Sequence, residues 1–105
     1  MAGAFQLHPG AAQDIIEIWQ YIANDNPAAA ASFREKILDS IRQLAAFPQL
    51  GHARPDLTSD PLRFQSVSDY LIAYAPDESP LLVIAVIHGR RNPRVLAAIL
   101  RMRER

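Results

Sequence analysis

The sequence predicts an α+β domain, with an N-terminal helical hairpin packed on a mainly antiparallel sheet of about four strands and a short C-terminal helix. Two long segments with apolar residues at helical spacing come first, separated only by NDNP at 24–27. Three segments rich in branched and aromatic residues follow, at 62–67, 70–75 and 81–88. Helices that precede a run of strands are typical of α+β proteins, and residues 1–105 suffice for a single domain with one core.

The N-terminal half predicts a short strand at 4–8 and then the hairpin. Pro9 can open the first helix, expected to end at about Asn24, and Asn26 with Pro27 can open a second helix that runs to about Ala46. The side chains expected to face the sheet are Ile15, Ile18, Trp19, Ile22, Phe33, Ile37, Ile41 and Leu44. Ile16 and Leu38 fall beside these stripes, which predicts an apolar groove along the hairpin.

The C-terminal half begins with a loop at 47–61 that contains three prolines and a glycine. The segment at 70–75 places Tyr70, Ile72 and Tyr74 on one face. The segment at 81–88 is apolar on both faces, which indicates a central strand that is covered on both sides. Asn92 and Pro93 repeat the pattern of a cap followed by proline and open the last helix.

Composition excludes several classes of protein. The net charge is zero, which argues against a generic nucleic-acid binder. There are no cysteines, which excludes disulfides and thiolate chemistry and fits a cytoplasmic location. The three histidines show no metal-ligand spacing and no cofactor motif occurs, so we expect no metal and no cofactor. The longest apolar run, 81–87, is too short to cross a bilayer, so we expect no membrane partner.

The strand at 81–88 runs into HGRR, which brings a histidine and two arginines out of a buried segment. In a continued strand His88 and Arg90 would point to one face and Arg91 to the other. His88 could act as a general acid or base, although a lone histidine is more often only hydrogen-bonded. The alternative is a solvated strand end, with the arginines paired to Asp56, Asp60 or Asp69.

Arginine is concentrated at the C-terminal end of the chain. Residues 88–105 hold six arginines and one acid, Glu104, and every basic residue of the chain except Lys36 is an arginine. Arg94 and Arg101 share a face of the last helix with Arg105. This pattern predicts either a surface that attracts anions or the wet side of an amphipathic helix.

Three motifs together resemble a known family. The loop FPQLGHARPDL carries Pro48, Gly51, Arg54, Pro55, Asp56 and Leu57, the strand DYLIAY carries Tyr70 and Tyr74, and VIAVIHGRR follows. In this order and spacing, from about Phe5 to Arg91, the sequence resembles the ParE branch of the RelE/ParE toxins of bacterial type II toxin–antitoxin modules. The resemblance implies two N-terminal helices on an antiparallel sheet. It also implies a ParD-like antitoxin partner, encoded beside the toxin, whose disordered C-terminal part neutralises it.

The family divides by function. RelE-like members cut messenger RNA on the ribosome with basic residues and often a tyrosine or histidine near the C-terminus, whereas ParE-like members inhibit DNA gyrase. RNA cleavage needs one group to deprotonate the 2′-hydroxyl and another to protonate the leaving oxygen. Arginine transfers protons poorly, and after Arg91 the chain has no Tyr, His, Lys or Asp. The sequence therefore favours a non-enzymatic gyrase inhibitor without a small-molecule substrate.

These arguments assign the following roles. We expect the target to be bound by His88, Arg90, Arg91, Arg94 and Arg101, and the antitoxin by Ile16 and Leu38. No catalytic residue is expected, and in a ribosome-dependent endonuclease the candidates would be His88, Arg90 and Arg91. A degenerate module that binds its antitoxin but poisons nothing is the third possibility.

Overall fold

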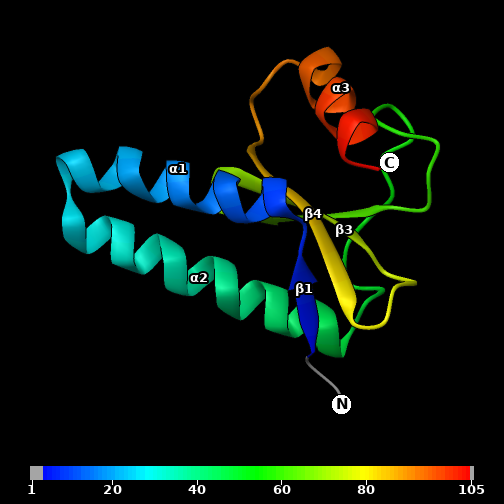
Figure 1. Cartoon of the computed structure of the whole chain (residues 1–105), viewed down its shortest axis with the longest axis horizontal. Helices are drawn as coiled ribbons and strands as arrows, with labels where there is room; N and C mark the ends of the chain where they lie inside the picture. The colour runs from blue at the N-terminus through cyan, green and yellow to red at the C-terminus, as the bar shows by residue number, and fades with distance from the viewer. Residues whose placement is uncertain (1–3, 105) are drawn as a thin grey trace.

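The computed structural model describes residues 4–104, and its architecture is the predicted α+β fold. Its elements, in chain order, are β1 (Phe5–Leu7), α1 (Pro9–Asp25), α2 (Pro27–Ala46), β2 (Arg63–Val67), β3 (Tyr70–Ala75), β4 (Leu81–His88) and α3 (Pro93–Arg103) (Figure 1). The sheet order is β1-β4-β3-β2, and only β1 runs parallel to its neighbour. No helix within residues 4–104 is long and apolar enough to cross a membrane.

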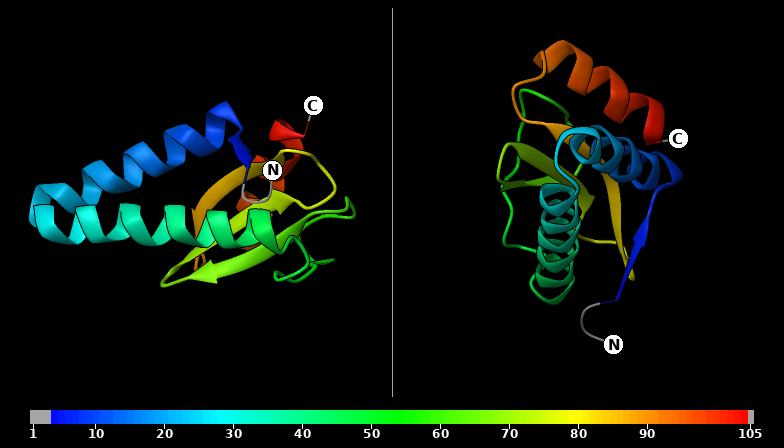
Figure 2. Two further views of the ribbon diagram at one scale, coloured as in Figure 1. Left: turned by 90° about the horizontal axis from the view of Figure 1, so that it is seen from below. Right: turned by 90° about the vertical axis from the view of Figure 1, so that its left-hand side faces the viewer.

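The helical hairpin begins and ends where its caps predict. His8 caps α1 through its Nδ1, which accepts from the Gly10 N–H at 2.9 Å, and Asn26 caps α2 by accepting from the Ala29 N–H at 3.0 Å. Pro9 and Pro27 each occupy a first helical position, where no N–H is needed. The two helices meet at this turn and diverge toward the sheet (Figure 2), and buried side chains of both belong to one apolar cluster with the sheet.

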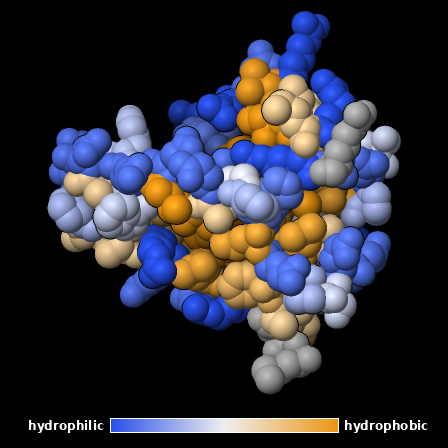
Figure 3. Space-filling view, viewed as in Figure 1, coloured by the Kyte–Doolittle hydropathy of each residue, from blue (hydrophilic) through white to orange (hydrophobic). Residues whose placement is uncertain are grey.

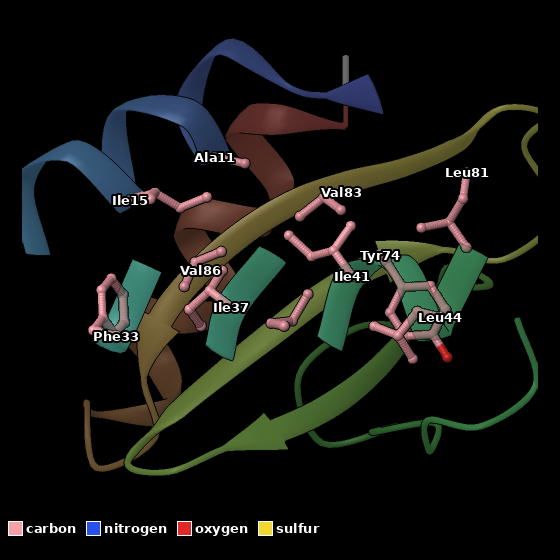
Figure 4. Close-up of a cluster of buried hydrophobic side chains, with 11 residues drawn as sticks. Ala11, Ile15, Phe33, Ile37, Ile41, Leu44, Tyr74, Leu81, Val83 and Val86 are labelled. Carbon is pink, nitrogen blue, oxygen red and sulfur yellow. The ribbon is translucent and has the colours of Figure 1, made fainter. Parts of the chain in front are cut away.

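The sheet is covered on both faces, as the apolar pattern of β4 predicts. The hairpin packs on one face through Ile15, Phe33, Ile37, Ile41 and Leu44, against β3 and β4 (Figure 4). On the other face, Leu96 and Leu100 of α3 join Leu57 and Leu62 of the long loop. β4 therefore lies between two apolar clusters.

An irregularity in β4 divides its side chains between these clusters. The pairing with β3 shifts between Ala73 and Tyr74, which face Ala85 and Val83 respectively. This inserts Ile84 as an extra residue, so Ile84 and Ala85 both belong to the cluster under α3, whereas Val83 and Val86 face the hairpin. If side chains alternated strictly between the two faces along all eight residues, one half of the strand would be assigned to the wrong cluster.

The loop motif is held in place by Tyr74, which is fully buried. Its hydroxyl accepts from the Gly51 N–H at 2.9 Å and donates to the Pro48 carbonyl at 2.7 Å. A Cβ at position 51 would lie 2.6 Å from this hydroxyl, so only glycine fits. Leu57 enters the core at the far end of the loop, and burial raises the pKa of Tyr74.

Trp19 corrects the predicted core. Its side chain is 40% exposed, whereas Ala11 and Ile15 are the buried residues of α1 and Ile18 and Ile22 are partly buried. Trp19 follows Ile16 by three positions, and this places it on the border of the stripe, toward the exposed Ile16. The predicted helical period of α1 is therefore right, but the predicted set of sheet-facing residues extends too far around the helix, to Trp19.

We expect Ile37→Ala to lower the free energy of unfolding by roughly 2–5 kcal/mol, because Ile37 is fully buried and its loss leaves a cavity. Trp19→Ala should cost about 1 kcal/mol, as is common for partly exposed positions. Urea unfolding of both variants measures the difference. A larger loss for Trp19→Ala would contradict the packing of the hairpin.

Candidate functional site

Beyond β1, part of the edge of β4 is closed by side chains from two helices. β1 pairs only with Leu81–Val83. Further along, the Val86 N–H donates to Asp14 Oδ2 at 3.0 Å, and Arg103 Nη1 donates to the Ile84 carbonyl at 3.3 Å. The two side chains also bind each other through two hydrogen bonds of 2.5 and 3.0 Å, and they are only 17% and 19% exposed. We call this arrangement the Asp14–Arg103 clamp.

The clamp binds both of its charged side chains to the fold. Asp14 binds a strand of the sheet and the end of α3. Arg103 was grouped with the basic tail, but its charge is neutralised by Asp14. Gly10 makes this possible, since a Cβ there would lie 2.4 Å from Arg103 Nε. A glycine in the first turn of α1 thus gives the guanidinium room to reach its partner.

A cleft of about 470 Å³ lies between α1 and the end of β4, next to the clamp. Its lining residues are Asp14, Glu17, Ile18, Tyr21, Tyr70, Val86, Ile87, His88 and Arg91. We call it the α1–β4 cleft. The His88 ring packs edge-to-face on Tyr70 with centroids 5.3 Å apart, and Tyr70 packs likewise on Phe33 at 5.1 Å. Burial, and then the charge of Asp69, raises the pKa of Tyr70.

The turn after β4 reverses the predicted grouping of His88, Arg90 and Arg91. The strand ends at His88, whose carbonyl accepts from the Arg91 N–H at 3.0 Å. Strand alternation therefore stops, and Arg91 lines the cleft with His88. Arg90 instead lines a smaller hollow of about 220 Å³ together with Arg54. The expectation that His88 and Arg90 share a face is wrong for this reason.

Five arginines are exposed and take part in no ion pair within residues 4–104. One of them, Arg34, lies on α2, and the other four follow β4: Arg90, Arg91, Arg94 and Arg101. We call these four the basic surface. Asp56 pairs with Arg54 through two hydrogen bonds of 2.8 and 2.9 Å, so it does not neutralise the arginines of the basic surface. The Arg54 guanidinium in turn lowers the pKa of Asp56. The predicted alternative of structural pairing therefore does not hold for these four, and Arg105 lies outside the described residues.

The remaining acid of the tail, Glu104, lies near Asp60 of the long loop. Burial, and then the neighbouring Asp60 carboxyl, raises the pKa of Glu104 to about 7. Its Oε1 is buried without a hydrogen-bond partner among residues 4–104. The folded pKa lies above the ordinary value of 4.5, so the folded chain holds the proton more tightly. The contribution of this group to stability therefore falls as the pH rises from 4.5 to about 7.

The predicted antitoxin residues differ in exposure. Ile16 is 48% exposed, whereas Leu38 is only partly buried and contributes less surface. Trp19, which sequence reasoning placed in the core, adds a second exposed apolar side chain on α1. Figure 3 shows apolar surface gathered between the two helices and toward β1. Apolar surface is thus present along the hairpin, with contributors that were predicted only in part.

Comparison with known proteins identifies a family. Residues 5–93 fit the family model described as the ParE toxin of the type II toxin-antitoxin system, parDE. No curated protein matches the chain. The matched residues include the hairpin, the whole sheet and the HGRR turn, but only the first residue of α3.

Asp14→Ala should destabilise the fold by roughly 3 kcal/mol, because it leaves Arg103 without a counter-charge in a largely buried position. The Val86 N–H would also lose its partner, so its hydrogen exchange should accelerate. Asp39→Ala is the matched control. Because the Asp39–Arg42 pair is exposed, this change should lower the free energy of unfolding by less than about 0.5 kcal/mol. Equal losses in the two variants would show that the clamp carries no special role.

Proposed function

The chain belongs to the ParE toxin family of type II toxin–antitoxin systems, and from this premise we propose that it acts by binding its target, DNA gyrase, and not by cleaving RNA. The observation that carries the proposal is the basic surface. Its four guanidinium groups are exposed and none is engaged by a carboxylate of residues 4–104. Such groups suit planar contacts with carboxylate or phosphate on a macromolecule.

The geometry of His88 supports binding over catalysis. Its Nδ1 accepts from the Arg90 N–H at 3.1 Å, so the neutral ring carries its proton on Nε2. Held in this way the exposed nitrogen can donate a hydrogen bond, but it has no lone pair free to accept a proton. A general base for the 2′-hydroxyl would have to break the bond to Arg90. His88 is therefore better suited to orienting the turn than to proton transfer.

A ribosome-dependent endonuclease is the alternative that one observation favours. The α1–β4 cleft brings Tyr70, His88 and Arg91 to the same place. Tyr70 is not available as a base because burial raises its pKa, which keeps the phenol protonated. An RNase would then need an imidazolium at His88 as general acid and a second group, still unassigned, as base.

The antitoxin is proposed to occupy the apolar surface of the hairpin. Ile16 and Trp19 are exposed on α1 and lie within one helical turn of each other, so they can form one apolar contact. Leu38 on α2 is partly buried, and we propose that its exposed part belongs to the same contact. An amphipathic helix of a ParD-like partner would cover these residues, in the manner of a helix that fills a groove. Ile16, Trp19 and Leu38 do not line the α1–β4 cleft, so a ParD-like partner seated on them would contact a surface other than the one that Arg91 lines.

Arginine substitutions test the target. Arg90→Ala and Arg91→Ala should each weaken inhibition of supercoiling by roughly 10-fold, since a hydrogen bond to a charged group is worth about 1.5–3 kcal/mol. Arg42→Ala, at an exposed arginine of α2, is the control and should leave inhibition unchanged. Purified gyrase and plasmid DNA provide the assay, and the melting temperature of each variant shows that it is folded.

His88→Gln separates binding from catalysis, because glutamine can still hydrogen-bond but cannot transfer a proton. We expect little change in supercoiling inhibition and no messenger cleavage on ribosomes by the unmodified chain. If His88 were a general acid, the substitution should lower cleavage roughly 100-fold or more. Cleavage by the unmodified chain that is lost in His88→Gln, with gyrase unaffected, would replace the gyrase proposal with the endonuclease.

Ile16→Asp combined with Leu38→Asp should weaken antitoxin binding by at least about 10-fold, since each change places a charge on the apolar surface of the hairpin. Calorimetry with the neighbouring antitoxin measures the loss, and Asp39→Ala on the polar side of α2 is the matched control. Unimpaired binding by the double variant would move the antitoxin to another surface.

A further inference from the structure

The floor of the α1–β4 cleft is a strand edge. The Val86 N–H points away from β3, since it donates to Asp14 on α1. In an antiparallel ladder the N–H and C=O of one residue point the same way, and every second residue repeats the direction. The Val86 carbonyl and the His88 N–H therefore face α1 as well. The His88 carbonyl is taken by the Arg91 N–H, which ends the edge.

This edge offers an acceptor and a donor side by side, from residues i and i+2. Their complement is a planar group with a hydrogen-bond donor next to an acceptor. Adenine and cytosine present this pattern, with an exocyclic amino group next to an unprotonated ring nitrogen. Uracil, thymine and hypoxanthine present a carbonyl next to an N–H, so in the same ring orientation they set carbonyl against carbonyl and N–H against N–H. Only a ring that is turned over would match the edge, and that places its sugar and phosphate on the other side.

The walls of the cleft suit the rest of a nucleotide. Tyr21 is 78% exposed and Tyr70 lies deeper, so aromatic rings are available for stacking on a base. Arg91 lines the rim and belongs to the unpaired basic surface, which provides a site for a phosphate. Glu17 lines the side formed by α1 and forms no ion pair within residues 4–104, so it can accept from a sugar hydroxyl. A volume of about 470 Å³ is in the usual range for small-molecule sites.

We propose that the α1–β4 cleft binds a nucleotide whose base carries an amino group beside a ring acceptor, read by the backbone of Val86 and His88 with the phosphate at Arg91. The same chemistry is offered by a free adenine or cytosine nucleotide and by an unpaired nucleotide of single-stranded DNA. The inference goes beyond gyrase inhibition and does not rest on it.

The base edge is tested with paired ligands that differ only at that edge. Titration of the ¹⁵N-labelled full chain with adenosine monophosphate should move the amide signals of Val86, Ile87 and His88. Inosine monophosphate keeps the phosphate, sugar and ring shape but inverts donor and acceptor. With its phosphate held at Arg91 the base cannot turn over to restore the match, so it should bind at least about 10-fold more weakly. Cytidine and uridine monophosphates form a second pair of this kind, in which the cytidine nucleotide should bind more tightly. Equal affinities within each pair, or shifts away from the cleft, would overturn the proposal.

Variants separate the contributions of the walls. Arg91→Gln should weaken both purine nucleotides by roughly 10-fold and leave their ratio unchanged, because the phosphate contact is common to both. Tyr21→Ala should also weaken both. Arg42→Gln, remote from the cleft, is the matched control and should change neither. Binding that is insensitive to both Arg91 and Tyr21 would place the ligand elsewhere and overturn the proposal.

A third set of ligands identifies the source. Single-stranded oligo-dA that binds more tightly than adenosine monophosphate and shifts the same three amides assigns the cleft to an unpaired base of DNA. Tighter binding of the mononucleotide assigns it to a free nucleotide, and absence of both overturns the site. The supercoiling assay is run separately. If the gyrase proposal fails in that assay, the nucleotide titrations still show whether the cleft binds a nucleotide.

Discussion

The unpaired edge of β4 is the constraint on which the other features depend. β4 spans eight residues, but β1 is only three residues long and pairs with its first three. An open edge in the middle of a fold would leave buried backbone groups without partners and would invite other strands to add. Asp14 and Arg103 close part of it with side-chain groups. The remaining stretch, at Val86 and His88, becomes the floor of the α1–β4 cleft. The clamp and the cleft are thus two consequences of one short strand.

Much of the fold follows from local signals. Both hairpin helices begin where their caps and prolines place them, and the end of α2 at Ala46 also agrees, because these signals act within a few residues. The covered central strand follows from its apolar pattern alone. Trp19 was misplaced because a stripe read from spacing does not show how wide the contact with the sheet is. Packing decides that width, and packing depends on the partner element.

The site was predicted less well, for reasons that are also physical. The Asp14–Arg103 clamp joins residues 89 positions apart, and neither residue has a local signal that sets it apart from solvent-facing charge. The grouping of His88 with Arg91 depends on where the strand stops, which the apolar run indicates only to within a residue or two. Tyr21 was overlooked because an exposed tyrosine on a helix is unremarkable until the opposite wall is known. The sequence shows which residues are basic, but it does not show which side chains lie next to them in the fold.

A chain of zero net charge presents a basic surface because residues 88–105 hold six arginines and one acid, and four of these arginines form no ion pair within residues 4–104. Arg103 is neutralised by Asp14, and Arg54 is neutralised by Asp56. These two arginines therefore stabilise the structure and add little to the electrostatic potential at the surface. α3 is held at its start by the Asn92 cap, in the middle by Leu96 and Leu100, and at its end by Arg103. Arg94 and Arg101 therefore project from a helix whose position is fixed at both ends. When a partner binds them, little conformational entropy is lost, because the backbone that carries them is already ordered. This preorganisation lets a few exposed guanidinium groups serve as a binding surface.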